Sequence, residues 1–303
     1  MSPTSTPGCS TPLSFEFLGK GFKVSVGADK FIWREDQFFR MEKERFQGMK
    51  NNGKTFILAY DHGMEHGPSD FKGLPETADP ERVFKLSTFE DVNILAVQKG
   101  LAETYYDSYS DKVNLLVKLN GTPSMKKDVP YSPKNCTVKR AVEIGADAVG
   151  YTVYPGSIAE EKMFEDFREV QENAREHGIP VVMWAYPRGN EIDDDTTPEV
   201  VSYGARIGLE LGADMVKVKY TGSRKNMEEV TRVTGDMDVV VSGGSRKEDK
   251  EFLEMLDKSL EAGCVGTAVG RNVWKRKDPE KIIKAIGDLL FRDKTVEEAI
   301  ENF

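Results

Sequence analysis

Short, continuous apolar runs recur along the chain from residue 55 onward, each followed by a turn and then a segment with helical periodicity. Continuous apolar runs are typical of strands in a parallel sheet that is covered on both faces. The pattern therefore predicts eight buried parallel strands. They span residues 55–60, 92–97, 114–120, 148–154, 180–186, 215–220, 238–242 and 266–270.

Helical periodicity fills the intervals, most clearly at residues 138–144, 160–177, 198–211, 248–262 and 279–291. Eight strands alternating with helices predict an α/β fold, a single (β/α)8 TIM barrel. An open, doubly wound sheet is the alternative, because periodicity does not show whether a sheet closes.

The chain before the first strand has a different pattern. Residues 1–12 are rich in Ser, Thr, Pro and Gly, residues 22–26 alternate as in a strand, and residues 36–50 have a helical pattern. We predict an N-terminal extension at residues 1–40, which packs on the barrel or on a neighbouring subunit, and a catalytic barrel domain at residues 41–303.

Polar residues and glycines gather where the predicted strands end, and barrels place their active sites at that end. The predicted strand starts carry no comparable cluster, so this one-sidedness predicts an enzyme. The residues are Asp61, His62, Lys118, Asn120, Tyr154, Trp184, Tyr186, Lys217, Lys219, Ser242, Gly243, Gly244, Gly270, Arg271 and Asn272.

Two lysines lie near the end of the sixth run. Strand side chains alternate between faces, so Lys217 and Lys219 are expected to point the same way. Burying two ammonium groups is costly unless an anion meets them or one amine is neutral. A neutral lysine amine is a nucleophile for carbonyl carbon. Solvated lysines on an edge strand are the alternative.

The last two strand ends resemble a phosphate site. Ser242, Gly243 and Gly244 follow the seventh run, and Gly270 and Arg271 follow the eighth. Free backbone amides in such turns can hold a phosphate, and this pair of loops does so in many barrels. An arginine there can add a bidentate contact. Tight turns without a ligand are the alternative.

Three other residues, Tyr186, Arg188 and Asp61, have chemistry that suits such a site. Beside a cationic lysine, Tyr186 can donate or accept a proton; a core tyrosine is the alternative. Arg188 can meet a second anionic group. Asp61 can pair with a lysine or help to dehydrate a carbinolamine; a structural ion pair is the alternative. His62 and His66 lie on a glycine-containing loop without a third ligand, and no metal site is predicted.

Composition narrows the class of protein. The net charge of −9 argues against general nucleic-acid or membrane-surface binding, but it allows a local cationic pocket for an anionic metabolite. The three cysteines lack metal-like spacing, which favours a reduced, cytoplasmic protein. No apolar run reaches the roughly 18 residues that a membrane span needs.

Together these stretches resemble the archaeal-type (DhnA-type) class I fructose-1,6-bisphosphate aldolases. The resemblance covers about residues 45 to 292, and its segments are long and in order; residues 1–40 lie outside it. The matching segments are ILAYDHGMEHGP at 57–68, VKLNG at 117–121, VGYTVYPGS at 149–157, WAYPRG at 184–189, GADMVKVKYTG at 212–222, SGG at 242–244 and AVGRNVW at 268–274.

The resemblance implies a role for each site residue. Lys217 forms the Schiff base, Tyr186 transfers protons, Asp61 assists carbinolamine formation and dehydration, and Trp184 shapes the pocket. Lys219 lies with the substrate-binding residues, and we expect its charge to lower the pKa of Lys217. The 1-phosphate is held by Ser242, Gly243, Gly244, Gly270 and Arg271, and the 6-phosphate by His66 and Arg188.

The implied activity is reversible cleavage of fructose 1,6-bisphosphate to dihydroxyacetone phosphate and glyceraldehyde 3-phosphate, in glycolysis and gluconeogenesis. The family uses no metal or other cofactor and forms homo-oligomers, often decamers. Two alternatives stay open: a related Schiff-base synthase that makes an amino-dideoxy-heptulosonate, and a non-catalytic barrel that binds a sugar phosphate. Trp184, Tyr186 and the loop from His62 to His66 favour the aldolase.

Overall fold

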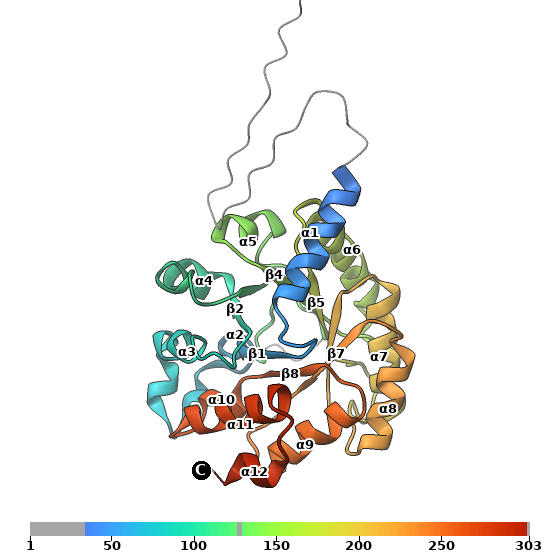
Figure 1. Cartoon of the computed structure of the whole chain (residues 1–303). Coiled ribbons are helices and arrows are strands. Elements are labelled where there is room, and N and C mark those ends of the chain that lie inside the picture. The colour runs from blue at the N-terminus through green and yellow to red at the C-terminus, as the bar shows by residue number, and fades with distance from the viewer. Residues whose placement is uncertain (1–33, 126–128, 302–303) are drawn as a thin grey trace, which may run out of the picture.

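The computed structural model describes residues 34–125 and 129–301. Eight parallel strands form a closed barrel in sequence order, and β8 pairs with β1 to close it (Figure 1). The (β/α)8 barrel is therefore confirmed, and the open sheet is excluded. The strands are β1 (Thr55–Tyr60), β2 (Ile94–Gln98), β3 (Leu115–Lys118), β4 (Ala148–Val153), β5 (Val181–Ala185), β6 (Met215–Val218), β7 (Asp238–Ser242) and β8 (Gly266–Val269).

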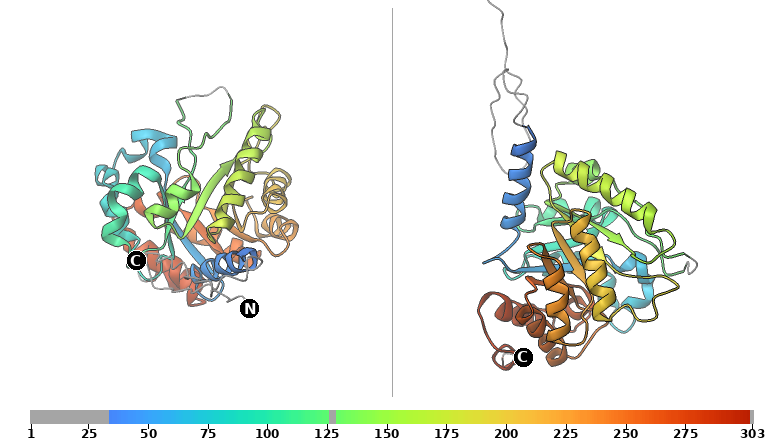
Figure 2. Two further views of the ribbon diagram at one scale, coloured as in Figure 1. Left: turned by 90° about the horizontal axis from the view of Figure 1, so that it is seen from above. Right: turned by 90° about the vertical axis from the view of Figure 1, so that its right-hand side faces the viewer.

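Helices surround the strands as an outer ring (Figure 2). The main ones are α1 (Arg34–Gly48), α3 (Pro80–Leu86), α4 (Lys99–Tyr105), α5 (Val138–Ile144), α6 (Glu160–Glu176), α7 (Pro198–Glu210), α8 (Arg224–Val233), α9 (Asp249–Glu261) and α11 (Pro279–Phe291). Shorter elements are α2 (His62–His66), η2 (Gly67–Phe71), η3 (Pro75–Ala78), η4 (Tyr106–Tyr109), α10 (Arg271–Trp274) and α12 (Val296–Ile300). No helix in the described part of the chain is long and apolar enough to cross a membrane.

Side-chain caps fix where several helices begin. The hydroxyls of Thr137, Thr197 and Ser223 each accept a hydrogen bond from a backbone amide in the first turn of α5, α7 and α8. Such a cap satisfies a donor that has no partner inside the helix. At the end of α5, Gly145 has a φ of 98°, a left-handed conformation that suits glycine and turns the chain towards β4.

Strand alternation divides the core into two layers. One face of the sheet packs on the helices, and the other fills the barrel with residues such as Ile57, Ala96 and Val182. Met49, just after α1, belongs to the inner layer, so the end of α1 closes the amino-terminal mouth of the barrel. The opposite mouth, at the carboxyl ends of the strands, carries the candidate site.

The N-terminal segment was expected to be an extension with a boundary at residue 40. The helix α1 begins at Arg34, continues past that boundary and contacts α6. The strand predicted at residues 22–26 lies outside the described residues. The division into two domains stays a prediction.

Candidate active site

Lys217 lies on the inner face of the barrel near the end of β6. Its side chain is buried, and burial lowers its pKa to about 8. The positive charges of Lys118 and Arg271 contribute to this lowering, whereas the negative charges of Asp61 and Glu65 oppose it. With a pKa near 8, about one in ten of these amines is neutral at pH 7, which makes Lys217 a usable nucleophile.

A second buried lysine shares this site. Lys118, the last residue of β3, is only 1% exposed, and burial lowers its pKa. Its Nζ lies 5.1 Å from the centroid of the Trp184 ring, and the Nζ of Lys217 lies 4.9 Å from it. Both ammonium groups are within the range at which an aromatic ring attracts a cation.

We expected the positive charge of Lys219 to lower the pKa of Lys217, and this expectation is wrong. Strand β6 ends at Val218, so Lys219 lies beyond the alternating segment, where it is partly exposed and paired with Asp195. The like charge that acts on Lys217 comes from Lys118, across the barrel. The predicted contact between Lys219 and substrate stays a prediction.

Asp61 follows β1 and is buried beside these lysines. Burial would raise its pKa, but the positive charges of Lys217 and Lys118 help to lower it. Burial lowers the pKa of His62 to about 4, so this imidazole is neutral at pH 7. Asp61 is therefore an ionised carboxylate facing a cationic cluster, as its predicted role requires.

Tyr186 follows β5 directly. Burial raises the pKa of its phenol well above the ordinary value, and the negative charges of Asp61 and Glu65 raise it further. A hydrogen bond with the side chain of Ser242 opposes this rise. The phenol is therefore protonated at neutral pH and ready to donate a proton.

Trp184 occupies the barrel interior between β4 and β6. A Cβ atom at Gly150 would lie 2.5 Å from Cζ3 of Trp184, so only glycine leaves room for the indole in this position. Trp184 also pairs in register with Lys217. The predicted role of Trp184 in shaping the substrate pocket stays a prediction.

The two glycine turns lie side by side. The Nδ2 of Asn272 donates to the backbone oxygens of Gly243 and Ser245, at 2.8 and 3.0 Å, and ties the turns together. Within the described residues, Nε of Arg271 is buried without a hydrogen-bond partner. Its guanidinium lies 3.7 Å from Asp70, outside hydrogen-bond range. A guanidinium beside two glycine turns, with a buried Nε that has no hydrogen-bond partner, suits an anionic ligand.

His66 is the last residue of the short helix α2, where a loop was predicted, and Arg188 follows β5 on a loop. The His66 ring stacks on His62, with 5.7 Å between centroids. The guanidinium of Arg188 lies 4.5 Å from the Tyr154 ring centroid, and its charge acts on both Lys118 and Tyr186. Both residues therefore flank the buried cluster.

Lys118 was predicted only as one of the polar residues at the strand ends, without a role, and Glu65 was not predicted, although both act electrostatically on Lys217. A signal was present for each in the sequence. Lys118 interrupts an apolar strand at its last position, and Glu65 lies inside the loop between His62 and His66. Among residues 34–125 and 129–301, no group of three His, Cys, Asp or Glu side chains is arranged to hold a metal ion.

A buried lysine with a lowered pKa, facing an ionised carboxylate and a proton-donating phenol, is suited to imine formation with a ketone. Together with the barrel, this chemistry defines a lysine-dependent lyase.

Comparisons with known proteins identify the family of this chain. The family model described as DeoC/LacD family aldolase matches residues 55–276. The chain belongs to this family and, within it, to the archaeal-type class I fructose-bisphosphate aldolases.

Two curated relatives carry the name class 1 fructose-bisphosphate aldolase. The protein of Halobacterium salinarum is 49% identical over 252 residues, which are 83% of this chain and 96% of the relative. The protein of Thermoproteus tenax is 45% identical over 249 residues, which are 82% of this chain and 94% of the relative.

Solved structures agree with these relatives. One is an archaeal fructose-1,6-bisphosphate aldolase with its catalytic Lys covalently bound to the carbinolamine intermediate. It is 43% identical, with a TM-score of 0.77, over 84% of this chain and 98% of its own. A fructose-bisphosphate aldolase from Slackia heliotrinireducens is 30% identical, with a TM-score of 0.80, over 91% and 92%.

Proposed function

We propose that this chain is a class I aldolase that reversibly cleaves fructose 1,6-bisphosphate through a Schiff base on Lys217. The products are dihydroxyacetone phosphate and glyceraldehyde 3-phosphate. The observation that carries the proposal is the buried Lys217 amine, whose pKa is lowered to about 8 beside Asp61 and Lys118. The names of the relatives support the same substrate.

The glycine turns define how the substrate binds. The 1-phosphate contacts the backbone amides of Ser242, Gly243, Gly244 and Gly270 and the guanidinium of Arg271. Support comes from the buried Nε of Arg271, which lacks a protein partner within the described residues. His66 and Arg188 bind the 6-phosphate.

The reaction begins when the neutral Lys217 amine attacks the C2 ketone and forms a carbinolamine. Tyr186 donates the proton with which the C2 hydroxyl leaves as water, and an iminium and a phenolate remain. The phenolate then takes the proton of the C4 hydroxyl, because a phenol of raised pKa gives a strong base. The C3–C4 bond breaks, the aldehyde leaves, and its electron pair forms an enamine on Lys217.

The same residues complete the cycle. Tyr186 protonates C3 of the enamine, and the iminium that results is hydrolysed by water, which returns a proton to the phenolate and frees the amine. Asp61 stays ionised, stabilises the iminium charge and orients the water that adds and leaves.

The decisive test is borohydride reduction of the protein with dihydroxyacetone phosphate, followed by mass spectrometry of the peptides. The proposal expects a stable adduct on Lys217, no adduct in Lys217→Ala, and an adduct on Lys217 in the matched control Lys219→Ala. A protein that binds the phosphate without forming an adduct would instead be a sugar-phosphate sensor.

The cleavage is expected to need no metal ion. EDTA should leave the cleavage rate unchanged, because the iminium itself withdraws electrons from the bond that breaks. Activity that is lost in EDTA and restored by a divalent metal would contradict the imine route.

The protein is further proposed to be a cytoplasmic homo-oligomer that acts in glycolysis and gluconeogenesis. The free, buried thiols of Cys136 and Cys264 are consistent with a reducing compartment. Light scattering of the purified chain measures the assembly directly, and a monomeric mass at micromolar concentration would contradict it.

A further inference from the structure

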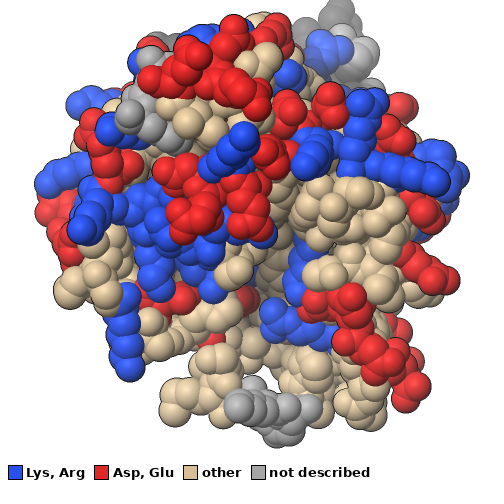
Figure 3. Space-filling model, turned by 90° about the horizontal axis from the view of Figure 1, so that it is seen from below, with Lys and Arg blue, Asp and Glu red and all other residues tan. Residues whose placement is uncertain are grey.

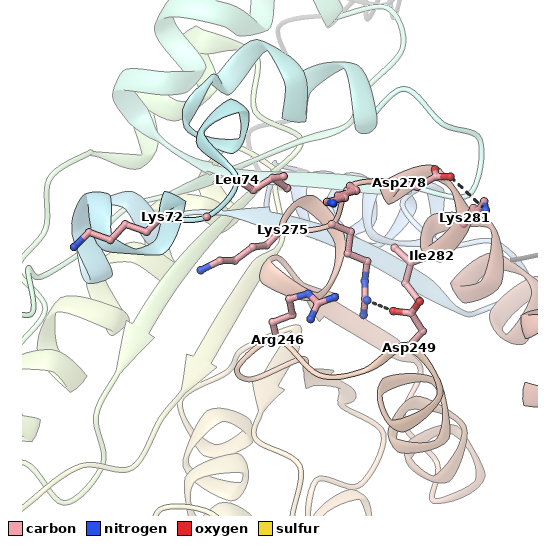
Figure 4. Close-up of a pocket in the computed structure, with 11 residues that line it drawn as sticks. Lys72, Leu74, Arg246, Asp249, Lys275, Asp278, Lys281 and Ile282 are labelled. Carbon is pink, nitrogen blue, oxygen red and sulfur yellow. Dashed lines mark hydrogen bonds and ion pairs between the residues drawn. The ribbon is translucent and has the colours of Figure 1, made fainter.

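A cavity of about 550 Å³ lies outside the catalytic cluster, and we call it the basic groove. Its walls come from the segment between η2 and η3, from the start of α9 and from the connection between α10 and α11 (Figure 4). Six cations line it: Lys72, Arg246, Lys275, Arg276, Lys277 and Lys281. The volume is within the range of small-molecule sites.

The charge of the basic groove is opposite to that of the chain. The whole chain carries a net charge of −9, whereas the groove lining includes only two carboxylates, Asp249 and Asp278. Lysine and arginine side chains also gather on the face shown in Figure 3. Like charges held this close repel one another, so their assembly favours an anionic occupant.

The two carboxylates of the groove are already engaged. Asp249 pairs with Arg276, and Asp278 lies 3.6 Å from the Nζ of Lys281. Within the described chain, Lys72 and Lys277 make no ion pair, and Arg246 reaches only Glu248, at 3.6 Å. Two of the six groove cations, Lys72 and Lys277, therefore have no carboxylate partner within the described chain, and the partners of Arg246 and Lys275 are 3.6 and 3.8 Å away.

One side of the groove is held rigidly. Arg276 is buried, its Nε donates to the backbone oxygen of Asn272 at 2.6 Å, and its Nη2 donates to that of Lys247 at 3.2 Å. Burial and the charge of Arg246 lower the pKa of Arg276 to about 10. Leu74 and Ile282 add apolar surface. The lining thus offers cations for anionic groups and apolar contact for an organic body.

We propose that the basic groove binds a small polyanion, a metabolite carrying two phosphate groups, and that this ligand weakens substrate binding at Arg271. The link is Asp70, whose carboxylate lies 3.8 Å from the Nζ of Lys275 and 3.7 Å from Nη1 of Arg271. Asp70 therefore stands between a groove cation and the cation of the substrate-phosphate site.

The sign of the coupling follows from charge. A polyanion that engages Lys275 leaves Asp70 to pair with Arg271 alone, so Arg271 is less available to a substrate phosphate. The charge of the bound polyanion also opposes a second anion nearby. Both effects raise the KM for the bisphosphate, and thermodynamic linkage requires the substrate to weaken the polyanion equally.

The binding test is calorimetric titration of the full chain with inorganic pyrophosphate. The double variant Arg246→Gln, Lys277→Gln should bind at least tenfold more weakly than the wild type. The control is Lys250→Gln, Lys258→Gln on α9, which removes the same charge from lysines that pair with Glu254 outside the groove. The control should bind within twofold of the wild type.

Three outcomes of this titration overturn the proposal: no binding by the wild type, equal affinity in the groove variant, or equal weakening in both double variants. Light scattering adds a fourth outcome. If the groove variant changes the mass of the assembly, the groove is a contact between subunits instead.

The coupling test is kinetic. Pyrophosphate should raise the KM for fructose 1,6-bisphosphate to a plateau in the wild type, as two sites that can be filled together require. Asp70→Asn should still bind pyrophosphate but show a smaller rise, because only the repulsion between the two anions remains. A KM that climbs without limit would place the pyrophosphate in the substrate site, and a rise in Asp70→Asn equal to that of the wild type would remove Asp70 from the link.

Discussion

Strand β6 has an ionisable group near each of its ends, and burial shifts the pKa values of the two groups in opposite directions. Before its first residue, the carboxyl of Asp214 has a pKa raised by burial and shares a hydrogen bond with Glu42 of α1. Near its last residue, the pKa of Lys217 is lowered by burial to about 8. Removal from water favours the neutral form in both cases.

The difference between the ends lies in what covers them. At the amino end, α1 packs over the barrel mouth, and the Asp214 carboxyl accepts a hydrogen bond from the amide of Val181 at 2.8 Å. At the carboxyl end, Lys217 faces other charged groups and the proposed substrate pocket. Burial thus keeps a proton in the carboxyl pair of Glu42 and Asp214 at the amino end, and it makes Lys217 a better nucleophile at the carboxyl end.

The largest effect is expected where the carboxyl end does chemistry. Tyr186→Phe removes the proton donor but keeps the ring, so kcat should fall about 10²–10⁴-fold. Steady-state cleavage assays measure this, with circular dichroism as the control for folding. Because Tyr186 acts after the amine attacks, borohydride should still trap some adduct. A kcat within threefold of the wild type would assign proton transfer to another residue.

The next effect tests the charge that lowers the pKa of Lys217. Lys118→Met removes one of the positive charges that lower the pKa of Lys217, so this pKa should rise above 8. A rise of one unit lowers the neutral fraction at pH 7 about tenfold. The acidic limb of the pH–kcat/KM profile should therefore move to higher pH.

The matched control keeps the charge. Lys118→Arg should leave the limb closer to that of the wild type than Lys118→Met does. An unchanged limb in Lys118→Met would show that the charge of Lys118 does not lower the pKa of Lys217.

Local pattern predicted most of the fold. The bounds of β1, β7, α5 and α11 match the prediction, because each is a long apolar or amphipathic segment between clear turn signals. We predicted a closed barrel from the number of strands. The pairing of β1 with β8 establishes the closure, and no local sequence pattern predicts that pairing.

The sequence predicted the site residues that directly follow strands. It did not predict interactions between residues that are distant in sequence. Lys219 was chosen because it neighbours Lys217 along the chain, whereas Lys118 reaches Lys217 from β3. The pair of Glu42 and Asp214 depends on the docking of α1 under β6. Such contacts need the three-dimensional arrangement.

A smaller effect is expected at the amino end. Burial and the charge of Asp214 raise the pKa of Glu42 to about 8, above the ordinary 4.5. Between pH 4.5 and 8 the native state thus keeps a proton that the unfolded state releases, so this stabilisation is present at low pH and is lost as pH rises through about 8.

Glu42→Gln keeps a hydrogen-bond donor to Asp214 but does not titrate. Its free energy of unfolding should therefore fall less between pH 5 and 9 than that of the wild type, by on the order of 1 kcal/mol. Urea unfolding at pH 5, 7 and 9 measures this, with the exposed Glu44→Gln as control. Equal slopes in all three proteins would mean that the carboxyl pair does not bind a proton on folding.

The smallest effect is expected at Lys219, just past the carboxyl end of β6. Its pair with Asp195 is partly exposed, so Lys219→Met should lower the free energy of unfolding by about 0–1 kcal/mol. The acidic limb of the pH–kcat/KM profile should stay near 8, because Lys118 supplies the like charge on Lys217. A raised KM with an unmoved limb would confirm the predicted contact between Lys219 and substrate. A limb that moves as far as in Lys118→Met would restore Lys219 as the residue that tunes the nucleophile.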